Sequence, residues 1–165
     1  MIHALWSRGG TAASGTMART IPALLCAALA LAACALTDSR IKTRTVAIEV
    51  APNANADNAL AVDLVFVHEN TLLPSFTEMP SANWFKNRDQ LKLANPTGIE
   101  VHSFEVIPGQ KGPRFKVEGR ANDALGAFVF AGYDTPGPHR ARIDGIPAVV
   151  LRLGEKDFAV AAPAS

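Results

Sequence analysis

The segment Leu60–His68, LAVDLVFVH, carries the clearest structural pattern of the chain. Its even positions are all apolar: Leu60, Val62, Leu64 and Phe66. Its odd positions mix Ala61, Asp63, Val65 and Val67. Successive side chains of a strand point to opposite faces of a sheet. The alternation therefore predicts a β-strand whose even face lies on a hydrophobic core.

A second alternating run precedes this segment. Residues 43–50, TRTVAIEV, place Val46, Ile48 and Val50 on one face, which predicts another strand with one face on the core. Between the two runs lies 51–59, APNANADNA, whose Pro, Asn and Asp residues favour turns. We expect the two strands to form a hairpin around this loop. The loop is longer than most hairpin loops, and long loops more often carry function.

The period changes after His68. Apolar residues recur three to four positions apart, at Leu72, Leu73, Phe76 and Met79, as on one face of a helix. Pro80 interrupts this pattern, and Ser81 is suited to be the N-cap of a helix over 82–93. Residues 95–98, NPTG, end it. We expect two short helices, or one broken helix, laid over a sheet.

The remainder of the chain returns to short strands. Alternating or apolar runs at 99–107, 113–118, 124–133, 139–143, 146–153 and 156–161 predict them. The first changes parity between Val101 and Phe104, which predicts a bulge near His102–Ser103. The run 124–133 is nearly all apolar and should be the most buried. Asp144-Gly145 predicts a two-residue hairpin turn between its neighbours.

These patterns together predict a mainly β protein of seven or eight short strands. A two-sheet β-sandwich with a short helical insertion after the second strand is the natural arrangement for them. The sequence shows no internal repeat. We expect the sandwich domain to span 43–162.

The N-terminal region has the pattern of an export signal. The apolar run Ile21–Cys34, IPALLCAALALAAC, follows Arg19 and ends in Leu-Ala-Ala-Cys. This pattern resembles a bacterial lipoprotein signal, which predicts a signal peptide over 1–33, with a possible start at Met17. It also predicts acylation of Cys34 and a spacer over 34–42. An ordinary cleaved signal and a retained amphipathic segment are the alternatives.

The residue after Cys34, the net charge and the cysteine count bear on the protein's location and partners. Ala35, rather than Asp, follows the cysteine, which by the same resemblance favours the outer membrane with the domain facing the periplasm. Lys and Arg number 16 against 15 Asp and Glu, so no basic excess indicates nucleic-acid binding. The two cysteines are Cys26, inside the signal, and Cys34. With Cys34 acylated, no disulfide is expected.

No local motif indicates catalysis, a metal or a cofactor. The histidines of the mature chain, His68, His102 and His139, are far apart and lack metal-ligand spacing. Ser103 has no nucleophile-elbow setting, and Ser81 is explained as a cap. We therefore expect a protein that is not an enzyme. Two other classes stay open: a periplasmic module that binds a glycan or small ligand, and a hydrolase assembled from distant residues.

The order of these features resembles a known family. A lipobox, a strand, a Pro/Asn/Asp-rich loop, the strand LAVDLVFV, a helical excursion and a run of strands are similar to TssJ (SciN-like) lipoproteins of type VI secretion. The resemblance covers about residues 43–161. It implies a transthyretin-like β-sandwich that tethers the inner-membrane protein TssM to the outer membrane by binding its periplasmic domain. By position, it implies partner contacts from Pro52, Asn53, Asn55, Asp57 and Asn58.

Overall fold

The structure is a computed structural model that describes residues 40–163. The expected signal peptide over 1–33, the expected acylation site Cys34 and most of the spacer lie outside the described residues. Within the described part, no helix has the length and apolar character needed to cross a bilayer.

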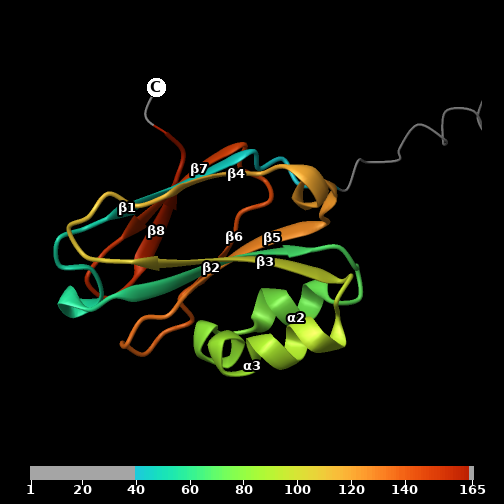
Figure 1. The fold of residues 1–165 in the computed structure, drawn as a ribbon, viewed down its shortest axis with the longest axis horizontal. Coiled ribbons are helices and arrows are strands. Elements are labelled where there is room, and N and C mark those ends of the chain that lie inside the picture. Colours follow the sequence, from blue (N-terminus) through green and yellow to red (C-terminus); the bar gives the residue numbers. More distant parts are fainter. Residues whose placement is uncertain (1–39, 164–165) are drawn as a thin grey trace, which may run out of the picture. The chain divides into compact units, whose positions relative to one another are not determined.

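The described residues form two four-stranded sheets, which confirms the predicted mainly β sandwich (Figure 1). One sheet has the order β4-β1-β7-β8, with strands Arg114–Lys116, Thr45–Val50, Ala148–Leu153 and Phe158–Ala161. The other has the order β3-β2-β5-β6, with strands Ile99–Val106, Leu60–Val67, Gly126–Ala131 and Arg140–Arg142. β1 and β7 are parallel, and the other pairs are antiparallel.

Both predicted hairpins are wrong. β1 and β2 belong to different sheets, so the loop 51–59 crosses from one layer of the sandwich to the other. Asp144-Gly145 does lie in a turn, closed by a 3.1 Å bond from Ile146 N to Ile143 O. That turn joins β6 of one sheet to β7 of the other. Alternation shows that a strand has an apolar face, but it does not say which strand lies beside it.

The main core lies between the two sheets. It contains the even face of β2, as predicted, together with inward side chains of β1, β5 and β7. Its largest members include Val46, Ile48, Leu60, Val62, Leu64, Phe66, Val129, Leu151 and Leu153. Full burial of each such side chain contributes about 1.5–3 kcal/mol relative to exposure.

A second core lies on the opposite face of the β3-β2-β5-β6 sheet. The helices α2 (Leu73–Glu78) and α3 (Ser81–Ala94) cover this face, as Figure 1 shows. Phe76 and Trp84 pack there on Phe128 and Phe130, and the Trp84 and Phe130 rings stack at 5.2 Å. β2 and β5 are therefore buried on both faces, which explains why 124–133 reads as nearly all apolar.

A carboxylate is buried beneath the second helix. Asp63 on β2 is 0% exposed, and its Oδ2 accepts bonds from Trp84 Nε1 at 2.8 Å and Arg88 Nη1 at 3.2 Å. A buried charge needs such partners because it has lost its hydration. The pairing fixes the position of α3 on the sheet.

β3 contains no bulge, contrary to the prediction. Its register with β2 is continuous from Leu60 opposite Val106 to Val67 opposite Ile99. The parity change has a different cause: Ile99 faces the helical core, whereas Val106 faces the core between the sheets. One end of β3 is covered on one face of the sheet, and the other end is covered on the opposite face. The strand therefore carries apolar residues at odd positions near its start and at even positions near its end.

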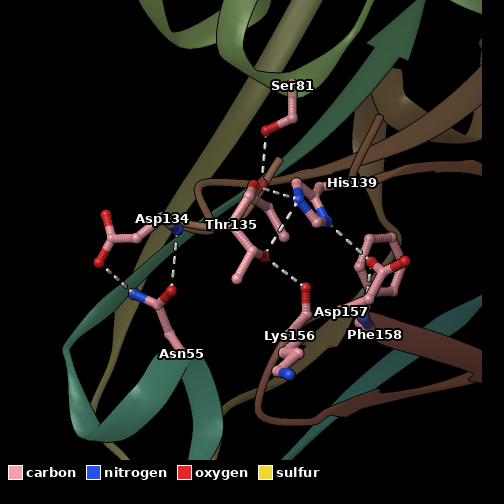
Figure 2. Close-up of polar contacts among 9 residues, drawn as sticks. Asn55, Ser81, Asp134, Thr135, His139, Lys156, Asp157 and Phe158 are labelled. Carbon is pink, nitrogen blue, oxygen red and sulfur yellow. Dashed lines mark hydrogen bonds and ion pairs between the residues drawn. The ribbon is translucent and has the colours of Figure 1, made fainter. Parts of the chain in front are cut away.

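Between β2 and β3 the chain forms two helices, α2 and α3, which is one of the two arrangements expected there. Ser81 is the first residue of α3 rather than its N-cap, which is Pro80. The Ser81 hydroxyl donates instead to the carbonyl oxygen of Ala131 on β5 (Figure 2). The hydroxyl therefore donates to a distant strand instead of accepting from the first N–H groups of the helix, as an N-cap would.

Candidate functional site

The crossing loop Ala51–Ala59 has an unusual backbone. It contains the short 3-10 helix η1, Ala54–Asp57, in which Asn55, Ala56 and Asp57 have φ of 46°, 50° and 66°. Non-glycine residues rarely adopt this left-handed region, which costs roughly 1–2 kcal/mol per residue. Such conformations persist where surrounding contacts hold them, and they are concentrated at functional sites.

The side chain of Asn55 supplies those contacts. It is 3% exposed, and its Oδ1 accepts a 3.0 Å bond from the backbone N–H of Asp134 (Figure 2). Its Nδ2 donates to Asp134 Oδ2 at 3.4 Å and to the carbonyl oxygen of Ala59 at 3.3 Å. The amide thus joins the loop to the segment that follows β5. Asparagine also tolerates the left-handed conformation better than most residues.

Backbone bonds attach the same loop to two further turns. Ala51 N donates to Leu153 O at 3.0 Å, and Asn55 N donates to Gly154 O at 3.2 Å. Ala51 O accepts from Gly109 N at 3.2 Å, in the turn after β3. Gly109 has φ +74°, which glycine adopts without strain. Three connections therefore meet at one end of the sandwich.

The structure separates the five predicted contact residues into two groups. Pro52, Asn53, Asp57 and Asn58 are exposed, whereas Asn55 is buried and occupied within the loop. Asn53 Nδ2 also donates to Glu155 Oε2 at 3.1 Å on the neighbouring β7–β8 turn. The four exposed residues can meet a partner, and the buried one positions them.

The structure adds a residue that sequence reasoning missed. Ile107, directly after β3, is 50% exposed and begins the turn that bonds to Ala51. In the sequence it reads as the last apolar residue of a strand, so nothing marked it as surface. We call Pro52, Asn53, Asp57, Asn58 and Ile107 the loop-end surface. It combines two exposed apolar side chains, those of Pro52 and Ile107, with polar neighbours, as protein interfaces do.

Hydrogen bonds around the buried side chain of His139 connect two further segments at this end of the fold. His139 is 5% exposed; its Nδ1 is 3.0 Å from Asp157 Oδ1, and its Nε2 is 2.7 Å from the carbonyl oxygen of Thr135 (Figure 2). Thr135 Oγ1 donates to Lys156 O at 2.7 Å. The network ties the connection after β5 to the β7–β8 turn.

The partners of His139 and Ser81 show how these polar side chains are used within the fold. Asp157 and His139 form an acid–imidazole pair, but the other ring nitrogen faces the Thr135 carbonyl, and Ser81 is bonded to Ala131. The hydroxyl nearest the ring, Thr135 Oγ1, is 3.5 Å from Nε2 and donates to the carbonyl oxygen of Lys156 at 2.7 Å.

Two other histidines of the described part, His68 and His102, form a separate cluster. Glu100 lies between His102 Nε2 at 2.8 Å and His68 Nε2 at 3.7 Å. Burial, together with the positive charge of Arg120, lowers the pKa of His68. Within residues 40–163, no group of three or more His, Cys, Asp or Glu side chains is arranged to hold a metal ion.

Comparison with known proteins identifies the fold. No protein-family model matches the chain, and no curated protein matches its sequence. Several solved structures do match. The type VI secretion lipoprotein TssJ1 from Pseudomonas aeruginosa has a TM-score of 0.55 at 16% identity, covering 74% of this chain and 98% of that one.

The second structure is Serratia marcescens Lip, a membrane-bound component of the type VI secretion system. It has a TM-score of 0.53 at 13% identity, covering 73% of this chain and 96% of that chain. At such identities the likeness is one of fold, and function has to be argued from the surface. The chain therefore has the β-sandwich fold of TssJ-type lipoproteins, as its sequence resemblance implied.

Proposed function

We propose that the chain is a lipid-anchored assembly protein of a type VI secretion envelope complex. In this proposal the domain 43–162 faces the periplasm and holds the periplasmic domain of a TssM-like inner-membrane protein to the outer membrane. The observation that carries it is the fold shared with two type VI secretion proteins, the lipoprotein TssJ1 and the membrane-bound component Lip, whose chains are covered over 98% and 96% of their length.

The anchor in this proposal is Cys34. Its support is the sequence pattern Leu31-Ala32-Ala33-Cys34 behind an apolar run, with signal peptide 1–33 removed and 34–42 as a short spacer. Each buried methylene of an acyl chain contributes about 0.8 kcal/mol, so several chains on one cysteine hold firmly where one would not. Ala35 supports outer-membrane sorting.

The partner in this proposal contacts the loop-end surface. The geometry supports this choice because strained left-handed residues, an exposed Ile107 and several exposed polar side chains meet at one end. The loop conformation is held from within by Asn55, so the surface is formed before any partner arrives. A preformed surface loses less conformational entropy when it binds.

The alternatives have less support. A glycan-binding module needs exposed aromatic platforms, but Trp84 is 0% exposed and stacked on Phe130. A hydrolase needs a nucleophile directed at a base, whereas the hydroxyl nearest His139, Thr135 Oγ1, donates to the carbonyl oxygen of Lys156. A non-catalytic role agrees with the two structural neighbours, which are secretion lipoproteins.

A binding measurement tests the partner. The full-length lipidated protein in detergent is titrated with the periplasmic domain of the TssM-like protein of the same bacterium. Ile107→Asp should weaken binding by about tenfold or more, because it buries a charge at the interface. Leu93→Asp is the matched control, since Leu93 is 82% exposed on α3, and it should bind as the wild type does.

Two outcomes oppose this part of the proposal. Absence of binding at high micromolar concentration would remove the partner. Equal affinity of the Ile107→Asp and Leu93→Asp proteins would remove the loop-end surface as the contact.

The anchor is tested by Cys34→Ser. We expect loss of fatty-acid labelling and release of the protein from washed membranes into the periplasmic fraction. Retention of the serine variant in the membrane fraction would contradict the acyl anchor.

A further inference from the structure

One sheet edge differs from the other three. The edge strands β4, β6 and β8 contain three, three and four residues, whereas the edge strand β3 contains eight. Short edge strands are a common protection against unwanted pairing. Among the described strands, β3 alone presents an edge long enough to receive another strand.

The alternation of hydrogen bonds along β3 shows which of its backbone N–H and C=O groups do not bond to β2. His68 N donates to Gly98 O at 2.8 Å, which makes residues 98 and 68 a hydrogen-bonded pair. Hydrogen-bonded pairs recur every second residue in an antiparallel ladder, so Glu100, His102 and Phe104 bond to β2. Val101, Ser103 and Glu105 consequently direct their N–H and C=O groups outward.

β3 lacks several of the usual protective features of an edge, and its charged residues are Glu100 and Glu105. Its sequence IEVHSFEV has neither proline nor lysine, and its register with β2 is continuous, without a bulge. The side chains of Ser103 and Glu105 are exposed, so they leave access to this edge.

A pocket of about 290 Å³ lies beside the open edge. It is lined by Ala61, Asp63, Arg88, Ser103, Phe104 and Glu105. Oδ2 of Asp63 is bonded to Trp84 and Arg88, but its Oδ1 is buried and has no hydrogen-bond partner among the described residues. A buried carboxylate oxygen without a donor is costly. The charged lining consists of two carboxylates, Asp63 and Glu105, against one guanidinium, that of Arg88, which is already paired with Asp63. The pocket as a whole therefore favours a positively charged hydrogen-bond donor.

We infer that the partner of the loop-end surface lays an extended segment along β3 and places a lysine or arginine side chain in this pocket. The inference rests on the proposed function. Its occupant is the same partner because the open edge runs directly into the loop-end surface: Val106 ends β3, and Ile107 follows. Main-chain bonds to an added strand supply affinity, and pockets for alternate side chains supply specificity.

Hydrogen exchange of the full-length lipidated protein, with single-residue resolution, tests the inference. In the free protein, the amides of Val101, Ser103 and Glu105 should exchange faster than those of His102 and Phe104. Adding the TssM-like periplasmic domain should slow the three outward amides by at least about tenfold. Protection of these amides in the free protein would show that the edge is already covered, and would overturn the inference.

Ser103→Pro removes one outward N–H and leaves the β2 ladder intact, because Ser103 does not bond to β2. It should weaken binding by about tenfold, whereas Ser103→Ala keeps the N–H and should bind like the wild type. Glu105→Lys is a second variant that preserves the strand. It should weaken binding of a basic segment about fivefold or more.

The outcomes separate the two proposals. If no complex forms, both are overturned. If the complex forms but the outward amides stay unprotected and Ser103→Pro binds like Ser103→Ala, the strand addition is overturned and the loop-end contact stands. Protection that rises with protein concentration, without the partner, would show self-pairing of β3 and would overturn the assigned occupant.

Discussion

Replacing Asn55 by alanine should destabilise the domain by about 2–3 kcal/mol. The amide of Asn55 makes one 3.0 Å bond as acceptor and two longer bonds as donor, at 3.3 and 3.4 Å. The acceptor bond contributes about 1 kcal/mol, and the longer pair contributes about 1 kcal/mol together. Alanine at φ 46° adds roughly 0.5–1 kcal/mol, because it adopts the left-handed region less readily than asparagine.

Denaturant titration of the full-length protein measures the change as a shift in the free energy of unfolding. Two further variants test the contributions of backbone strain and of the Asn55 hydrogen bonds to this change. Asn55→Gly loses the same hydrogen bonds but relieves the backbone strain, so it should be less destabilised than Asn55→Ala. Asn58→Ala is the matched control, since Asn58 is exposed and makes only a 3.5 Å bond to Ala56 O; it should change stability by less than about 0.5 kcal/mol.

The Asn55 variants should also bind the TssM-like domain more weakly, because the exposed loop residues would lose their fixed positions. The reasoning would be refuted if Asn55→Ala were within about 0.5 kcal/mol of the wild type. It would be refuted equally if Asn55→Gly were the less stable of the two, since strain would then contribute nothing.

Two further predictions concern stability and titration. Gly112→Ala should destabilise the protein by about 1–3 kcal/mol in the same assay, because a Cβ there would overlap the backbone carbonyl oxygen of Ile48; Gly145→Ala meets no atom within 4 Å and should be neutral. Equal stabilities would contradict this packing. Burial, aided by the charge of Asp157, raises the pKa of Tyr133 to about 12. Tyr133 is the single tyrosine, so absorbance at 295 nm should show its ionisation well above pH 10, and its stabilising effect should be lost as pH rises from about 10 toward 12. Ionisation near pH 10 in the folded protein would contradict the burial.

The sequence predicted the strands and helices well because their signals are local. Alternation marked β1 and β2, and the change to a spacing of three to four residues marked the helical layer. The even face of Leu60–Val67 does lie on the core between the sheets. Its odd face is buried as well, under α3, because a helical layer covers the sheet from outside.

The candidate site was only partly predictable. Turn-forming residues marked 51–59 as a loop, but they did not show that Asn55 is buried while its neighbours are exposed. Its partner Asp134 is 79 residues away in the chain, so no local pattern could have connected them. Ile107 was missed for a related reason, because an apolar residue at the end of a strand is exposed or buried according to what packs beside it.

The sequence by itself determined the class of the domain: short amphipathic strands with two helices after the second strand. The lipoprotein-type leader that it also indicates stays a prediction. Only the tertiary structure decided which strands pair, how 51–59 crosses between sheets, and that β3 keeps a long open edge. The physical reason is that side-chain periodicity records which face of a segment avoids water, and that preference is non-directional. The choice of neighbour depends on simultaneous packing of segments far apart in the chain.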